Sequence, residues 1–355
     1  MRNTNVRIDY SMPTTNPEVN SRLLTCSQDN IVFFARGNRV HYKHLTTSEE
    51  VGHLCKLQET RGDLRVLTCA GETHPELIAL GTSKGYIQIW DVKAKKMTMG
   101  WSTKEMSAMA WNGPVLSVGS IKGTIRHFDT RIEQTAKMKE QAPKVTRHQG
   151  PITSMGWNSE GKYLASGDKT GTVYTWEMGQ RIPLDVGDFV QRRKKMQHTA
   201  AISVITWCPW IPKVFTSADV KGTIRLWSCS PKEAATNALA PGVLELDSPI
   251  TGLYFSPHCK EFLTVHASAE PFPPGSEWKR AKVPTEHTIT VHAYPSLRHI
   301  KTQTVVEKAI GDSVLNSNGT KLVFQVPEEN KLYVSDVWAK RKEIRRQASY
   351  IGQIR

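Results

Sequence analysis

Short apolar runs separated by tight turns recur along the chain, and they are clearest between residues 148 and 177. Apolar and polar residues alternate through 152–157, a second apolar run covers 163–166, and a third run ends at Trp176. Turn-forming residues separate these runs at 158–161 and at Gly171. Runs of about 4–8 residues with a period of two, bounded by Gly and Asn, are typical of β-strands. The segment therefore predicts a meander of strands.

Copies of this meander occur throughout the chain. The Gly turn and the strand after it recur at residues 83–91, 121–129 and 220–228, and weaker copies lie at 38–44, 287–293 and 330–336. Strands that end in Trp and a turn lie at 109–113, 155–158 and 205–209. One such unit cannot bury both of its faces, so the copies must pack side by side.

These repeats resemble the WD repeat, whose units each form one four-stranded blade of a β-propeller. The resemblance implies an all-β, seven-bladed WD-repeat β-propeller over residues 21–338, with a short N-terminal arm (1–20) and a basic C-terminal tail (339–355). The blades are expected at residues 23–44, 64–94, 102–132, 148–178, 198–229, 250–297 and 305–338. Residues 43–62 and 179–197 are expected to be polar connections, and the Pro-rich segment 269–276 an excursion from the sixth blade.

One departure from the WD pattern concerns stability. Many WD repeats carry an Asp directly before the turn Gly, bonded to a His and a Trp of the same blade. That place holds Lys84, Lys122, Thr170 and Lys221 in this chain. We therefore expect the polar network to be incomplete in these blades, and stability to depend more on apolar packing between blades.

The composition indicates in which cellular compartment the protein is expected and which partners it favours. The chain has 355 residues, a net charge of +14 and six scattered cysteines without a CxxC pair. We expect reduced, mostly buried thiols in an intracellular protein, located in nucleus and cytoplasm, with no signal peptide and no membrane span. The basic runs at 191–195 and 340–346 contain no interleaved aromatic residues, so we interpret them as solvated segments. This argues against nucleic acid as a partner.

Several stretches resemble the Fizzy-type activators of the anaphase-promoting complex. They are residues 127–131, 197–202, 206–210, 255–261 and 294–297. The chain also ends in Ile354 and Arg355, which match the family's tail for docking on a TPR-helix subunit of that ubiquitin ligase. The resemblance implies a cell-cycle adaptor without enzymatic activity or cofactor, which recruits degron-bearing substrate proteins to the ligase. Checkpoint or inhibitor proteins are further partners to consider, and no membrane partner is expected.

The positions that match the family's degron receptors have changed. The first-blade position, acidic in the family, is Thr25, and the fourth-blade asparagine positions are Lys169 and Gly171. The fifth-blade and sixth-blade contact positions are Asp219 and Glu286. No sequence like the family's C-box, Asp-Arg-Tyr-Ile-Pro, occurs in the chain. Either the sequence is truncated or docking depends on the tail alone, and standard degron recognition is in question.

Other functions stay open. No HExxH, GxSxG or Gly-rich phosphate loop is present, the histidines are spread over different blades, and the Trp residues at strand ends are expected in the core. Residues 128–131 partly resemble the box by which WD-repeat receptors dock on cullin-based ligases. A basic nucleic-acid-binding scaffold and a divergent inhibitory or stage-specific regulator are the remaining alternatives.

Overall fold

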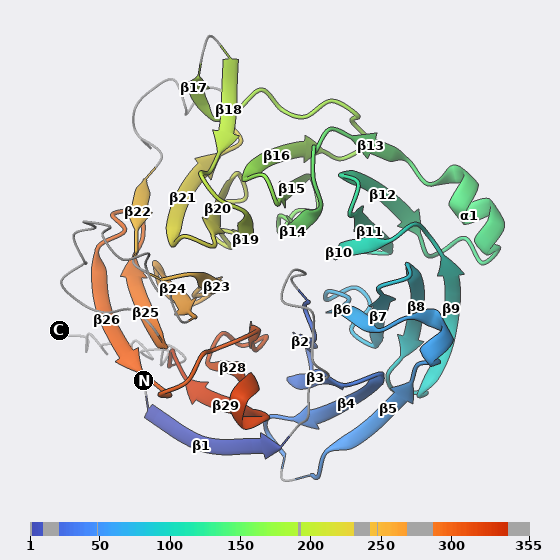
Figure 1. Ribbon diagram of the computed structural model, residues 1–355, viewed down its shortest axis with the longest axis horizontal. Coiled ribbons are helices and arrows are strands. Elements are labelled where there is room, and N and C mark those ends of the chain that lie inside the picture. Colours follow the sequence, from blue (N-terminus) through green and yellow to red (C-terminus); the bar gives the residue numbers. More distant parts are fainter. Residues whose placement is uncertain are drawn as a thin grey trace, which may run out of the picture.

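Seven antiparallel sheets surround a central axis, with the innermost strand of each sheet nearest the axis (Figure 1). The computed structural model describes residues 2–9, 21–47, 49–190, 193–230, 242–246, 248–267 and 287–339. The predicted all-β, seven-bladed propeller is confirmed. No helix among these residues is long and apolar enough to cross a membrane.

Successive strands of a blade lie progressively farther from the axis. The first blade contains β2 (Leu24–Cys26), β3 (Ile31–Arg36), β4 (Arg39–His44) and β5 (Gly52–Lys56). The second contains β6 (Leu64–Cys69), β7 (Leu77–Thr82), β8 (Tyr86–Asp91) and β9 (Lys96–Ser102). The third contains β10 (Met106–Asn112), β11 (Val115–Ser120), β12 (Thr124–Asp129) and β13 (Lys144–Thr146). The fourth contains β14 (Ile152–Trp157), β15 (Tyr163–Asp168), β16 (Thr172–Glu177), β18 (Arg193–Gln197) and, beyond β18, an additional strand β17 (Asp188–Val190).

The remaining blades complete the ring. The fifth contains β19 (Ile202–Trp207), β20 (Val214–Asp219), β21 (Thr223–Ser228) and β22 (Val243–Glu245). The sixth contains β23 (Ile250–Phe255), β24 (Glu261–His266), β25 (Thr288–Ala293) and β26 (His299–Thr304). The seventh contains β27 (Ser313–Leu315), β28 (Lys321–Val326), β29 (Lys331–Asp336) and β1 (Arg2–Asp9). Short helices occur at η1 (Glu59–Arg61), α1 (Thr135–Gln141) and η2 (Pro327–Glu329).

The seventh blade joins the two ends of the described chain. Strand β1 pairs antiparallel with β29, with Asp9 opposite Lys331 and Arg2 opposite Asp336. Part of the N-terminal segment 1–20 is therefore the outermost strand of a blade. This pairing closes the ring with backbone hydrogen bonds between distant parts of the sequence.

The outermost strands are the elements that the sequence pattern missed. The segments 43–62 and 179–197, predicted as connections, contain β5, β17 and β18. That prediction is wrong because strands on the outer side of a blade contact little of the core, and β5 and β18 bury only one or two side chains each. In β18, for example, Met196 is the one buried side chain. Such a strand lacks the alternation that identifies an inner strand.

Apolar clusters fill every interface between neighbouring blades. The cluster between the fourth and fifth blades contains Trp207, Phe215 and Trp227, and the one between the sixth and seventh contains Leu263 and Phe324. Fully burying a side chain of this kind contributes about 1.5–3 kcal/mol relative to leaving it exposed. Blade-to-blade packing is therefore a main source of stability.

Arg22 ties together blades that lie on different sides of the axis. Its backbone bridges to Val66 of the second blade. Its guanidinium donates to the carbonyl oxygen of Ser203 at 2.6 Å and pairs with the Asp312 carboxylate, Nη1 to Oδ1, at 3.3 Å. Asp312 also accepts a hydrogen bond from the backbone N–H of Leu24 at 3.1 Å. The backbone and side chain of this one residue thus connect the first, second, fifth and seventh blades near the centre of the ring.

Candidate protein-interaction face

Turns and connecting loops meet on one face of the ring, which we call the turn face. It is built from the turns 83–85, 121–123, 169–171 and 220–222 and from the loops 103–105, 147–151 and 198–201. Backbone hydrogen bonds join each loop to a turn, as from His198 N–H to Gly171 O at 2.8 Å and from Thr103 N–H to Gly85 O at 2.8 Å. The turn face therefore has a fixed backbone.

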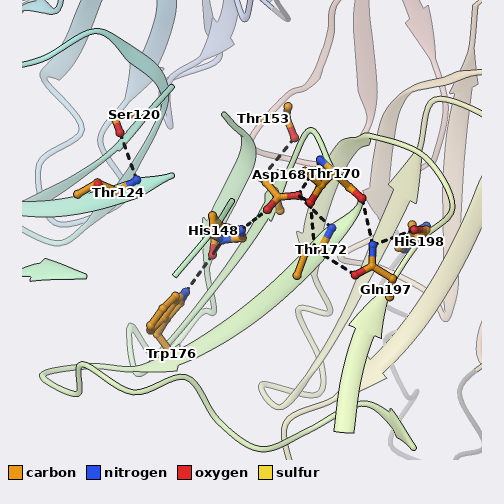
Figure 2. A network of polar contacts seen from close by, with 12 residues as sticks. Ser120, Thr124, His148, Thr153, Asp168, Thr170, Thr172, Trp176, Gln197 and His198 are labelled. Atoms are coloured by element: carbon orange, nitrogen blue, oxygen red, sulfur yellow. Dashed lines mark hydrogen bonds and ion pairs between the residues drawn. The ribbon is translucent and has the colours of Figure 1, made fainter. Parts of the chain in front are cut away.

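A chain of four polar side chains supports the turn face in the fourth blade (Figure 2). Trp176 Nε1 donates to Ser166 Oγ at 2.9 Å, and Ser166 Oγ lies 2.8 Å from His148 Nε2. His148 Nδ1 lies 2.8 Å from Asp168 Oδ2. Because Trp can only donate, Ser166 accepts from it and donates to Nε2, which leaves Nδ1–H to donate to the carboxylate. Every polar hydrogen in the chain of contacts then has an acceptor.

The carboxylate of Asp168 links these contacts to the turn above them. Its Oδ1 accepts the backbone N–H of Thr170 at 2.8 Å and of Thr172 at 3.0 Å. Burial alone raises the pKa of Asp168, but the hydrogen bonds from His148 and Thr170 outweigh it and hold the pKa below its usual value. Asp168 therefore stays ionised and fixes turn 169–171 against loop 147–151.

The fifth blade repeats the arrangement with His198, Ser217, Asp219 and Trp227. Trp227 Nε1 donates to Ser217 Oγ at 2.7 Å, Ser217 Oγ lies 2.7 Å from His198 Nε2, and His198 Nδ1 lies 3.1 Å from Asp219 Oδ2. The prediction that the network is incomplete is therefore wrong for the fourth and fifth blades. The Asp lies three residues before the turn Gly, not directly before it, so Thr170 and Lys221 do not replace it.

In the second and third blades, a side-chain hydroxyl and not a carboxylate binds the turn. In the second and third blades the Asp position is occupied by Thr82 and Ser120, whose hydroxyl oxygens accept the backbone N–H of Tyr86 at 3.1 Å and Thr124 at 3.2 Å. A single hydroxyl replaces the carboxylate there, and neither position is linked to a histidine.

The sixth blade has a version without a carboxylate. Ser248 Oγ lies 3.0 Å from His266 Nδ1, and Thr264 Oγ1 lies 2.7 Å from His266 Nε2 and 3.3 Å from His292 Nε2. Burial, reinforced by the neighbouring His292, lowers the pKa of His266 to about 3. Burial and the charge of His299 lower the pKa of His292 to about 4. Both rings are therefore neutral at pH 7.

These buried histidines predict acid destabilisation. His127, whose pKa burial lowers to about 4, belongs with His266 and His292. A histidine in the unfolded chain titrates at about pH 6.5. Between that pH and the folded pKa, the unfolded chain binds more protons, so stability falls as pH falls. We expect the urea midpoint to decrease from pH 7 to pH 5, and an unchanged midpoint would contradict the assignment.

The contacts in the fourth and fifth blades have the same order as a Ser–His–Asp catalytic triad, but their burial gives them another role. The side chains of His148, Asp168, His198 and Asp219 are all 0% exposed. Each serine oxygen already accepts a hydrogen bond from Trp. No substrate can reach either serine, so the two networks are structural.

The predicted degron-contact residues that the structure describes differ in their exposure and do not form one common site. Lys169 is exposed on the turn face, whereas Asp219 is fully buried in its own blade and offers no carboxylate to a ligand. Gly171 has φ +84°, and a Cβ there would lie 2.6 Å from the carbonyl oxygens of Ala200 and His198, so glycine is required for the turn. Thr25 is half-buried in β2 and accepts the N–H of Cys69 at 3.2 Å.

Other predicted positions do not join this face. Glu286, Ile354 and Arg355 lie outside the described residues. Arg131, from the cullin-docking alternative, makes a surface ion pair with Asp129 of its own blade, Nη2 to Oδ2, at 2.6 Å. Of the five degron-contact candidates, Lys169 is therefore the one whose side chain the described part of the chain exposes on the turn face.

The fold and its repeated network define a WD-repeat β-propeller. The family model described as WD domain, G-beta repeat matches residues 140–177. The chain is, more specifically, similar to Fizzy-type proteins over most of its length, which confirms the resemblance seen in the sequence. It is 28% identical over 248 residues to WD repeat-containing protein slp1 of Schizosaccharomyces pombe, covering 69% of this chain and 46% of that protein.

Further relatives carry related names. Protein FIZZY-RELATED 2 of Arabidopsis thaliana is 26% identical, over 77% of this chain and 52% of that protein. Anaphase-promoting complex subunit cdc20 of Dictyostelium discoideum is 26% identical, over 58% of this chain and 40% of that protein. A chain in the crystal structure of a mitotic checkpoint complex shares the fold, with a TM-score of 0.76 at 23% identity over 95% of this chain and 93% of that chain. The chain spans about half the length of the relatives it matches.

Proposed function

We propose that this protein is a substrate-recruiting adaptor subunit of the anaphase-promoting complex. The observation that carries the proposal is the similarity to Fizzy-type relatives, one of them named as a subunit of that complex, over most of the propeller. The adaptor binds degron-bearing proteins on its turn face and docks on the ligase through Ile354 and Arg355. It works in the nucleus and cytoplasm.

The physical basis of this activity is proximity. A rigid ring that binds a substrate and a ligase at the same time raises the effective concentration of the substrate at the ligase without performing chemistry. A terminal Ile-Arg offers an apolar side chain, a guanidinium and a carboxylate together. A TPR groove can bind the first in an apolar pocket and pair the other two with charged side chains.

Removing Ile354 and Arg355 is expected to weaken co-purification of the ligase. The truncated protein loses the apolar anchor and the guanidinium, and its new terminal carboxylate is misplaced in the groove. A quantitative pulldown from cell extract measures the ligase recovered for each amount of the adaptor.

The matched control replaces two nearby tail residues, Gln347→Ala and Ser349→Ala, and keeps the terminus intact. We expect this control to bind the ligase as the original chain does. Equal ligase recovery by the truncated protein and the control would remove the tail from the proposal.

The changed receptor positions favour a recognition chemistry different from that of a standard Fizzy-type adaptor. Thr25 replaces an acidic position and is engaged with the second blade, while Lys169 brings a positive charge to the fourth-blade turn. A turn face of this kind selects its substrates by a different set of contacts.

A further inference from the structure

Exposed basic side chains follow the turn face across four consecutive blades. We call this set the basic arc, and its members are Lys84, Lys104, Lys122, Arg147, Lys169 and Lys221. They lie in the turns of the second to fifth blades and in the loops between them. Among the described residues of these turns and loops, Glu105 is the one acidic side chain, and its charge acts on Arg65 of β6. The neighbouring loop 57–63, which contacts turn 83–85, adds exposed Glu59 and Asp63 at the Lys84 end of the arc. The basic arc therefore has an excess of positive charge.

The opposite face has a different charge pattern. Several of its basic side chains are paired with carboxylates, including Lys162 Nζ with Glu177 Oε1 at 3.3 Å and Lys321 Nζ with Asp336 Oδ1 at 2.9 Å. In the part of the chain that the structure describes, no member of the basic arc has a carboxylate partner within 4.0 Å. Lys84 donates instead to the carbonyl oxygen of Thr60 at 3.2 Å. The turn face thus carries six exposed basic side chains that follow one another around four blades and are not neutralised by a neighbouring carboxylate.

The backbone beneath the basic arc is held in place. Asp219 accepts the backbone N–H of Lys221 at 3.0 Å, Ser120 accepts that of Lys122 at 3.2 Å, and Lys169 donates its N–H to the carbonyl oxygen of Pro151 at 2.9 Å. The long side chains remain free to adapt, but their attachment points are fixed by the blades. Such an arrangement binds an extended ligand at several places with little ordering of the protein.

We infer that the basic arc binds acidic segments of partner polypeptides, rich in Asp and Glu. This inference rests on the proposed function and specifies the substrate class that the turn face takes. Carboxylates spaced along an extended peptide complement the lysine and arginine side chains and form charge-assisted hydrogen bonds with them. The sole aromatic among the strongly exposed apolar residues of the described chain is Phe189, which belongs to the β17–β18 hairpin outside the arc. The arc thus has no exposed ring on which a nucleic-acid base can stack.

The test is direct binding of a fluorescent Asp/Glu-rich peptide to the purified full chain. In the variant Lys122→Glu/Lys169→Glu/Lys221→Glu, binding is expected to weaken about tenfold or more, because several exposed charge pairs become repulsive. The matched control, Lys93→Glu/Lys213→Glu/Lys260→Glu, makes the same change of net charge on the opposite face and is expected to retain the original affinity. Thermal melting verifies that both variants are folded.

Three outcomes would overturn the inference. They are equal weakening by the two triple variants, equal binding of the Asn/Gln version of the peptide, and tighter binding of single-stranded DNA than of the acidic peptide at the same salt concentration. The ligase pulldown is measured separately on the same variants. If the variants recover the ligase normally but acidic-peptide binding does not depend on the basic arc, the peptide-binding role of the arc is rejected and the proposed adaptor function is retained.

Discussion

Replacing Arg22 with methionine is expected to lower the free energy of unfolding by about 3–5 kcal/mol. The substitution leaves the carboxylate of Asp312, whose side chain is 4% exposed, without its cationic partner. Burial already raises the pKa of Asp312, and the charge of Arg22 opposes that rise. The total stability of a typical domain is about 5–15 kcal/mol, so the expected loss is a large fraction of it. Urea denaturation at pH 7 measures it.

A second substitution separates the charge effect from lost packing. Asp312→Asn removes the buried charge and keeps a carbonyl oxygen that can accept the N–H of Leu24. In the Arg22→Met background we therefore expect Asp312→Asn to restore part of the lost stability. If the losses of unfolding free energy in the two single variants simply add in the double variant, Arg22 and Asp312 are not energetically coupled, and their ion pair does not stabilise the centre of the ring.

Asp219→Ala is expected to cost about 2–4 kcal/mol. It leaves three buried or half-buried donors without their acceptor: Nδ1–H of His198 and the backbone N–H groups of Lys221 and Thr223. The hydrogen bonds that outweigh burial and keep the pKa of Asp219 below its usual value are lost together. Equilibrium denaturation gives the change in unfolding free energy.

The corresponding position in the third blade provides the comparison. Ser120→Ala removes a hydroxyl that accepts two turn N–H groups but is not linked to a histidine. We expect a smaller loss, about 0.5–1.5 kcal/mol, because the two neutral hydrogen bonds share one acceptor and lie at an exposed or half-buried turn where water can replace it. Equal losses at the two positions would mean that the four-residue network adds nothing beyond the turn itself.

Much of the fold could be predicted because the inner strands are strongly patterned. Each is covered on both faces by neighbouring blades, so its apolar residues recur in register with the turn Gly, as at Gly85, Gly123 and Gly171. The outer strands β5 and β18 could not be predicted this way, since they are short, bury only one or two apolar side chains each and are identified by backbone pairing. The pairing of β1 with β29 joins distant segments and has no local signal.

The candidate site was harder to predict than the fold. Taking the residue directly before the turn Gly as the Asp position makes Lys221 a missing Asp. Matching Asp219 to a contact position of the family makes it a surface residue, although it is fully buried. The sequence alone does not distinguish a carboxylate that is buried against a histidine from one that is exposed. The repeated lysines next to the turn Gly were visible, but only the fold shows that Lys84, Lys122 and Lys221 lie on one face.

The seventh blade also constrains when the protein can finish folding. Its outermost strand, β1, leaves the ribosome before the other described strands, yet its partner β29 is the last of them to emerge. While the strands between them are being made, the nascent chain therefore carries an unpaired strand edge, which exposes backbone groups to other polypeptides. A need for chaperone protection during synthesis, and sensitivity to changes within β1, follow from that delay.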